Sequence, residues 1–102
     1  MIRAAFESQN GTIFRCSISG HAEFADAGQD IVCAAVSSAV QLSANLITET
    51  FQEQADVSAE NNLIRINLKH PETGNGSLVL DALLLHLQYL SEDYPQTIRI
   101  IS

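Results

Sequence analysis

The apolar residues of this 102-residue chain follow a period of two in some segments and a helical period in others. They alternate with polar residues over Thr12–Ser19 and Leu63–Leu68, which predicts strands with one buried face. They recur at helical spacing from Ile31 to about Gln52 and again over Ser77–Tyr94, which predicts two amphipathic helices. A chain that mixes these two periods is expected to pack strands against helices.

Turn residues divide the β-type segments into two hairpins. The Asn10-Gly11 pair, the strongest short hairpin signal, separates a strand over Ile2–Ser8 from the strand that starts at Thr12. Asn61-Asn62 forms a second turn, between a strand over Ala55–Glu60 and the strand that starts at Leu63. Each pair is expected to be antiparallel.

The remaining segments complete the order hairpin, helix, hairpin, helix, strand. Gly20–Gln29 has no apolar period and is expected to be a loop, and His70–Gly76 is expected to be another. Pro95 ends the second helix, and Thr97–Ile101 forms the last strand.

Each predicted helix carries one apolar stripe, so the economical packing places both on one face of a sheet. We therefore expect a single α+β domain over residues 1–102, a two-layer sandwich in which a mixed five-stranded sheet has two helices on one face, in the order ββαββαβ. The other face of the sheet would meet solvent or a second subunit. The expected stripes consist of Val32, Val36, Ala39, Val40, Leu42, Leu46 and Ile47 on the first helix and Val79, Leu83, Leu87 and Leu90 on the second.

Composition and charge exclude several classes of protein. A hydrophobic fraction of 46% argues against a disordered chain, and the short apolar runs argue against a membrane-spanning one. The first residues lack the cationic start and apolar stretch of a secretory signal, so we expect a cytoplasmic protein. Twelve acids against five bases give a net charge of −7, which repels nucleic acid and anionic lipid and favours basic partners.

The residues best suited to chemistry are His21 and Cys33. If Asp30 caps the first helix, Cys33 is its third residue, where unpaired N–H groups and the helix dipole favour a thiolate. His21, in the preceding loop, could fold back as the base, and the same N–H groups could bind an oxyanion. Asp30 could also orient His21, and Ser37 shares the helix face of Cys33.

Simpler interpretations of these residues remain open. A cysteine inside Ile-Val-Cys-Ala-Ala-Val is often a small core residue, and a histidine in a loop is often merely exposed. Cys16 alternates with Phe14 and Ile18 and is expected to pack in the core, and His70 and His86 are expected to be structural. The cysteines and histidines show no paired metal-ligand spacing, so we expect no metal and no cofactor.

Gly20-His21-Ala22, Gly28 and the run Asp30-Ile31-Val32-Cys33-Ala34-Ala35-Val36-Ser37 resemble the signature of the ribosomal-processing cysteine proteases of Firmicutes, the Prp or YsxB-like family. The resemblance covers essentially the whole chain. It implies that His21 and Cys33 form a catalytic dyad. It also implies a homodimer whose loop between the two residues is mobile, with Gly20 and Gly28 as hinges.

The resemblance further implies a substrate. This is the precursor of the large-subunit ribosomal protein L twenty-seven, from which the enzyme removes a short N-terminal extension by cutting after an aromatic pair. The basic ribosomal protein would be the partner, with no direct binding to nucleic acid or to a membrane. Two other functions stay open. One is a non-catalytic acidic partner or assembly factor for a basic ribosomal protein, and the other is a redox-responsive thiol protein, which the expected burial of Cys16 disfavours.

Overall fold

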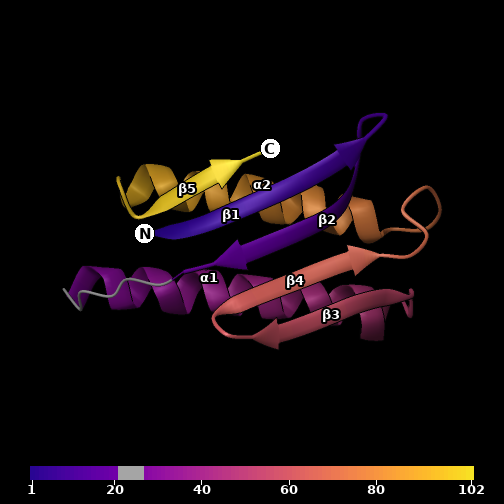
Figure 1. The fold of residues 1–102 in the computed structure, drawn as a ribbon, viewed down its shortest axis with the longest axis horizontal. Coiled ribbons are helices and arrows are strands. Elements are labelled where there is room, and N and C mark those ends of the chain that lie inside the picture. Colours follow the sequence, from indigo (N-terminus) through magenta and orange to yellow (C-terminus); the bar gives the residue numbers. More distant parts are fainter. Residues whose placement is uncertain (21–26) are drawn as a thin grey trace.

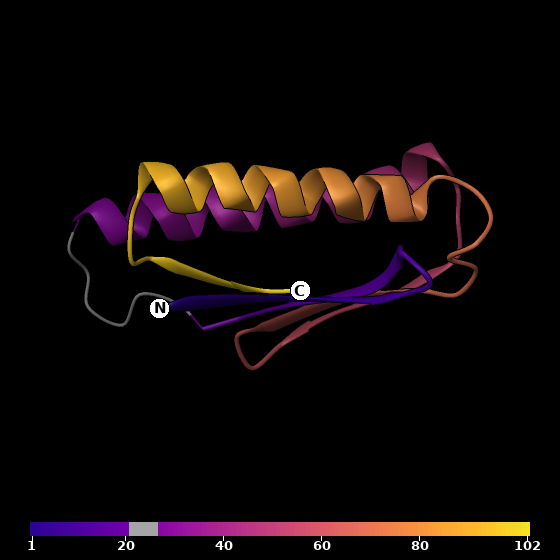
Figure 2. The same ribbon diagram turned by 90° about the horizontal axis from the view of Figure 1, so that it is seen from above.

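Two long helices cover one face of a five-stranded sheet in the computed structural model, which describes residues 1–20 and 27–102 (Figure 1). The strand order is β3-β4-β2-β1-β5. The elements are β1 (Ile2–Gln9), β2 (Thr12–Ser19), α1 (Ala27–Asn45), its π-helical continuation η1 (Leu46–Thr50), β3 (Ala55–Glu60), β4 (Leu63–Leu68), α2 (Gly76–Asp93) and β5 (Ile98–Ile101). The predicted α+β sandwich is confirmed, and Figure 2 shows the helices on one side of the sheet and its other face uncovered.

The sheet is mixed because β5 runs parallel to β1 while the other pairs are antiparallel. Both predicted hairpins form. Asn10 and Gly11 have φ values of 55° and 78°, and Asn61 and Asn62 have values of 54° and 61°. These left-handed conformations match the right-handed twist of the paired strands and produce tight two-residue turns. The second turn matters for the site, because it fixes Asn62 directly before the start of β4.

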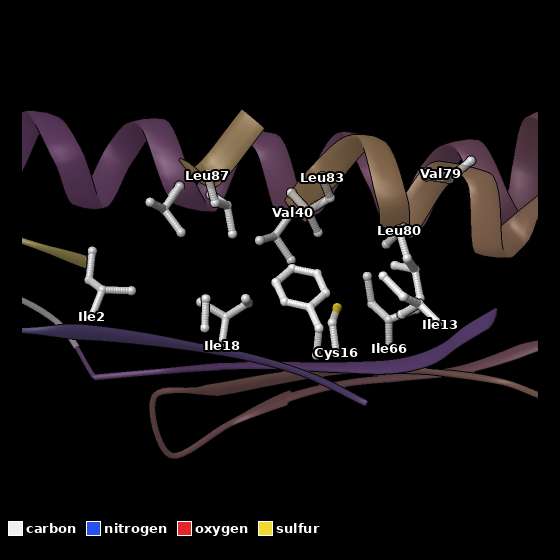
Figure 3. Packing of buried hydrophobic residues seen from close by; sticks show 14 of the residues in the cluster. Ile2, Ile13, Cys16, Ile18, Val40, Ile66, Val79, Leu80, Leu83 and Leu87 are labelled. Carbon is white, nitrogen blue, oxygen red and sulfur yellow. The ribbon is translucent and has the colours of Figure 1, made fainter. Parts of the chain in front are cut away.

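The core lies between the sheet and the helices. Alternate residues of β1 and β2, among them Ala4, Phe6, Cys16 and Ile18, point toward the helix layer and are buried. Figure 3 shows this layer of side chains meeting residues of both helices, including Val40, Val79, Leu80, Leu83 and Leu87. The predicted assignment of Cys16 to the core is confirmed.

The helix α1 begins at Ala27, so the predicted start after Asp30 is wrong and the expected loop over Gly20–Gln29 is shorter than expected. Asp30 is the fourth residue of the helix and not its N-cap. Ala27 and Gln29 are good helix formers, and a glycine inside a helix costs only about 1 kcal/mol relative to alanine. Each added residue gains a backbone hydrogen bond once the helix has started, so the helix extends through Gly28.

Leu42 departs from the predicted buried stripe of α1. It is 61% exposed, whereas Val32, Val36 and Val40 are buried. Its place is on the outer side of the helix layer, in a groove between α1 and α2. The helical period identified an apolar residue correctly but assigned it to the wrong face.

The segment Ile31–Thr50 is long and apolar enough to cross a membrane by length and composition alone, with a mean hydropathy of 1.6. Core helices of folded domains meet the same condition. Val32, Val36, Val40 and Ile47 along this segment are buried against the rest of the domain. We therefore describe it as a core helix.

The start of α2 is fixed by a residue from another part of the chain. The carboxylate of Glu53 accepts hydrogen bonds from the backbone N–H groups of Asn75 and Gly76, the latter at 2.8 Å. A Cβ atom at Gly74, where φ is +82°, would lie 2.2 Å from a Glu53 carboxylate oxygen. The negative carboxylate therefore satisfies donors at the positive end of the α2 dipole and holds the preceding loop against η1 and β3.

Candidate active site

Cys33 lies in the N-terminal half of α1, half-buried, with its side chain packed against the core residues. It is the seventh residue of a helix that begins at Ala27. The predicted third position is therefore wrong. Because only the first four N–H groups of a helix lack an intrahelical acceptor, the backbone N–H of Cys33 is not among the unpaired donors. The predicted stabilisation of a Cys33 thiolate, or of an oxyanion, by unpaired N–H groups at this residue is therefore wrong.

A cavity of about 160 Å³ brings Cys33 together with residues from the sheet. Ile2, Ile18 and Ile64, from β1, β2 and β4, form its apolar side. Because strand residues that share a face of the sheet recur every second position, these three belong to the face that meets the helices. The remaining lining residues are Gly20, Cys33, Val36, Ser37 and Asn62.

Gly20 brings the chain to the edge of this cavity and immediately precedes His21. Its φ of +80° is in the left-handed region, and a Cβ atom there would lie 2.7 Å from the carbonyl oxygen of Met1. Only glycine fits this conformation and this contact without displacement. The path by which the chain leaves β2 is therefore fixed beside the cavity that contains Cys33.

The other sequence-predicted site residues divide into three groups. His21 and the side chain of Asp30 lie outside the described residues. Ser37 lines the cavity together with Cys33, as predicted from their spacing on one helix face. Gly28 is a residue of α1, so its predicted place in a loop is wrong.

The second cysteine has the properties of a core thiol. Cys16 is fully buried, and burial raises the pKa of its thiol to about 11, an effect that a hydrogen bond with the backbone of Ile66 partly offsets. A thiol with this pKa is almost entirely protonated near neutral pH and is a poor nucleophile. Cys16 and Cys33 do not form a disulfide.

The histidines within the described residues lie away from Cys33. His70 is exposed, with its Nε2 atom 3.2 Å from Oε1 of Gln54. His86 lines the groove between α1 and α2, together with Leu42, Leu46, Leu78 and Leu83. This groove, with a volume of about 770 Å³, is larger than the cavity at Cys33 but has neither cysteine among its lining residues. We place the candidate chemistry in the smaller cavity because the accessible thiol is there.

Sequence reasoning did not identify Asn62 as a site residue. It assigned Asn61-Asn62 to a turn, and the structure confirms the turn. The pairing of β4 with β2 brings the start of β4 next to the end of β2, where the chain reaches Gly20. The turn signal was visible in the sequence, but its position beside Cys33 depends on this pairing.

The profile of the family described as cysteine protease Prp matches residues 1–99. The chain belongs to this family. It is 30% identical over 95 residues to the ribosomal processing cysteine protease Prp of Staphylococcus aureus, covering 91% of this chain and 90% of that protein. The Bacillus subtilis protein of the same description is 26% identical over 107 residues, covering 98% and 96%.

Solved structures of the family have the same fold. A crystal structure of the S. aureus protease with a substrate peptide superposes with a TM-score of 0.89 at 26% identity and covers 98% of this chain and 97% of that one. A second, with a covalently linked product peptide, gives a TM-score of 0.88 at 27% identity and covers 99% and 98%. These matches confirm the family resemblance seen in the sequence and the predicted enzyme class, a cysteine protease.

Proposed function

We propose that this protein is the endopeptidase that removes the N-terminal extension of the ribosomal protein L twenty-seven precursor, cutting after an aromatic pair, with His21 and Cys33 as its catalytic dyad. One observation carries the proposal. Gly20, the residue before His21, lines the same cavity as the half-buried Cys33. The relatives add support, because they are described as ribosomal processing proteases and one is described in complex with a covalently linked product peptide.

The proposed chemistry pairs the Cys33 thiol with the His21 imidazole. His21 accepts the proton of Cys33, and the thiolate attacks the carbonyl carbon of the scissile bond. The tetrahedral intermediate collapses to a thioester as protonated His21 gives its proton to the departing amine. Water then attacks the thioester, with His21 again as the base, and releases the new carboxylate and the thiol. Cys16 takes no part, because its thiol is buried and protonated.

The acidic charge supports a basic substrate. Lys and Arg are absent from α1, η1 and α2, so both helices carry only acidic charged residues, and the net charge of the chain is −7. A ribosomal protein is basic and would be attracted to this surface, whereas ribosomal RNA would be repelled. We therefore propose that the enzyme acts in the cytoplasm on free precursor and does not bind nucleic acid or a membrane.

The groove between α1 and α2 supports a homodimer. Leu42 and Leu78, which line it, are 61% and 62% exposed in the single chain. Contiguous exposed apolar surface of this kind commonly marks a protein interface. Sedimentation equilibrium of wild type and of Leu42→Lys tests the dimer. We expect a dimer for wild type and a monomer for the variant, and a monomeric wild type would contradict it.

Incubation of the purified protein with full-length precursor, followed by intact-mass and fragment-mass spectrometry, tests the cleavage reaction. We expect a single new N-terminus directly after the aromatic pair. A variant of the precursor with both aromatic residues replaced by alanine serves as the matched control and should remain uncut. Cleavage of both precursors, or of neither, would contradict the proposed specificity.

A further inference from the structure

Asn62 is the one residue of the β3–β4 turn among the lining residues of the cavity at Cys33. Asn61, its neighbour in the same turn, is not among them. The two residues have nearly the same φ, 54° and 61°. What distinguishes the two residues is therefore that Asn62 lines the cavity and Asn61 does not.

The turn itself does not require asparagine at position 62. The second central position of such a hairpin turn has positive φ and is most often glycine, which adopts this conformation without a steric cost. Asparagine tolerates the left-handed region less well than glycine does. The turn geometry alone therefore gives no reason to prefer a carboxamide to a glycine here.

The carboxamide of Asn62 is available to a ligand. The residue is exposed, and its side chain makes no hydrogen bond with any other residue in the ranges 1–20 and 27–102. A carboxamide offers two N–H donors and a carbonyl acceptor, which is the complement of a peptide group.

A peptide that enters this cavity needs such a partner. Ile2, Ile18, Ile64 and Val36 line much of it and offer only apolar side chains. When a peptide N–H or C=O group is buried against them, it loses its hydrogen bonds to water. This desolvation costs free energy unless another hydrogen bond replaces them. Among the described lining residues, Ser37 and Asn62 have a neutral polar side chain, and of these two only Asn62 can both donate and accept through separate atoms.

We propose that Asn62 is a substrate-binding residue, whose carboxamide hydrogen-bonds the backbone of the bound peptide beside the scissile bond. This inference rests on the proposed function, because it assumes that Cys33 attacks a peptide held in this cavity. It assigns a role in recognition to the β3–β4 turn, which is otherwise a structural connection. The interaction is with backbone groups, so it contributes to the affinity for any peptide that fits and not to the choice of side chain.

Asn62→Gly and Asn61→Gly form a matched pair of variants for the test. Both place glycine at a left-handed position of one turn, so both should fold at least as well as wild type. With the precursor peptide as substrate, we expect Asn62→Gly to lower kcat/KM about three- to tenfold, mainly by raising KM, as the loss of a neutral hydrogen bond predicts. Asn61→Gly should stay within about twofold of wild type, inside the scatter of single surface substitutions. Equal kinetics for the two variants would overturn the inference.

A binding measurement separates this inference from the proposed function. The same substitutions are made in a Cys33→Ala background, and the affinity for a fluorescently labelled precursor peptide is measured by anisotropy. We expect Asn62→Gly to weaken binding about three- to tenfold and Asn61→Gly to leave it unchanged. If wild type does not cut the peptide, the proposed function fails, and the anisotropy alone decides the inference. Binding that is absent, or that is the same in the two variants, overturns it.

Discussion

Gly20 and Cys33 line one cavity, although they belong to different layers of the sandwich. Gly20 follows the last residue of β2, and Cys33 lies on α1. The chain therefore leaves the sheet layer, at the residue before His21, beside the cavity that Cys33 lines.

Replacing Gly20 by alanine should impair cleavage. The added Cβ would lie 2.7 Å from the Met1 carbonyl oxygen at a φ of +80°, so the backbone before His21 must shift. We expect kcat/KM to fall by at least about tenfold, since misplacing a reacting group by about 1 Å can cost a hundredfold. Strain of about 1–3 kcal/mol should also appear in urea denaturation.

Gly11→Ala is the control for this variant. Gly11 has a similar φ of +78°, but a Cβ atom there meets nothing within 4 Å. Gly11→Ala should lower the free energy of unfolding, because alanine is strained at this φ, and it should leave cleavage unchanged. If Gly20→Ala is as active as Gly11→Ala, the backbone conformation at Gly20 is not needed for cleavage, and the prediction is contradicted.

Glu53→Ala should destabilise the fold. Its carboxylate accepts hydrogen bonds from the first backbone donors of α2, so its removal leaves Asn75 and Gly76 without this acceptor. Loss of a helix cap costs about 0.5–2 kcal/mol, which urea denaturation can measure. Glu72→Ala removes another carboxylate from the loop that precedes α2, where Glu72 is exposed and makes no ion pair with the described residues. It should change the free energy of unfolding by less than about 0.5 kcal/mol. Equal losses would argue against capping by Glu53.

Cys16 should make folding stability depend on alkaline pH. Burial raises the pKa of its thiol from 9.0 to about 11, so the unfolded chain releases this proton at lower pH than the folded chain does. The stabilisation is fully present below pH 9 and is lost as the pH rises toward 11. Between these values the slope approaches about 1.4 kcal/mol per pH unit. Denaturation of wild type and Cys16→Ala measures the difference, and identical slopes would contradict this account.

Much of the fold could be predicted from the sequence because local signals determine it. The alternation of apolar and polar residues predicted β2 and β4, and the turn residues predicted both hairpins. The single apolar stripe on each helix predicted the two-layer packing. The predicted start of α1 was wrong. Asp30 is a good N-cap residue in isolation, but the residues before it also favour a helix. Propensity alone does not decide between these alternatives.

Features that depend on tertiary packing could not be predicted. Glu53 and Gly76 are 23 positions apart, and no local pattern indicates that one caps the helix that begins at the other. Asn62 reaches the cavity only because β4 pairs with β2. Cys33 was singled out from an expected position at the start of a helix, whereas in the structure it is the seventh helical residue and lines a cavity, so its proposed role now depends on that cavity.

The proposed electrostatic attraction predicts a dependence on salt. If the −7 charge draws in a basic precursor, kcat/KM for full-length precursor should fall as ionic strength rises, because screening shortens the range of attraction. A short peptide that contains only the cleavage site should show a weaker dependence. Ribosome-bound precursor should be cut more slowly than free precursor. Equal rates for both, without any effect of salt, would contradict the attraction.

The most direct test of the dyad compares cleavage of the full-length precursor by wild type, Cys33→Ala, His21→Ala and Cys16→Ala. Cys33 and His21 are the proposed catalytic residues, whereas Cys16 is a buried thiol of the core. Circular dichroism first establishes that each variant is folded. We predict that Cys33→Ala and His21→Ala lose cleavage by at least about a thousandfold, as expected for a nucleophile and its base. Folded Cys16→Ala should retain most of the activity. A folded Cys33→Ala or His21→Ala variant that cuts at the wild-type rate would contradict the account.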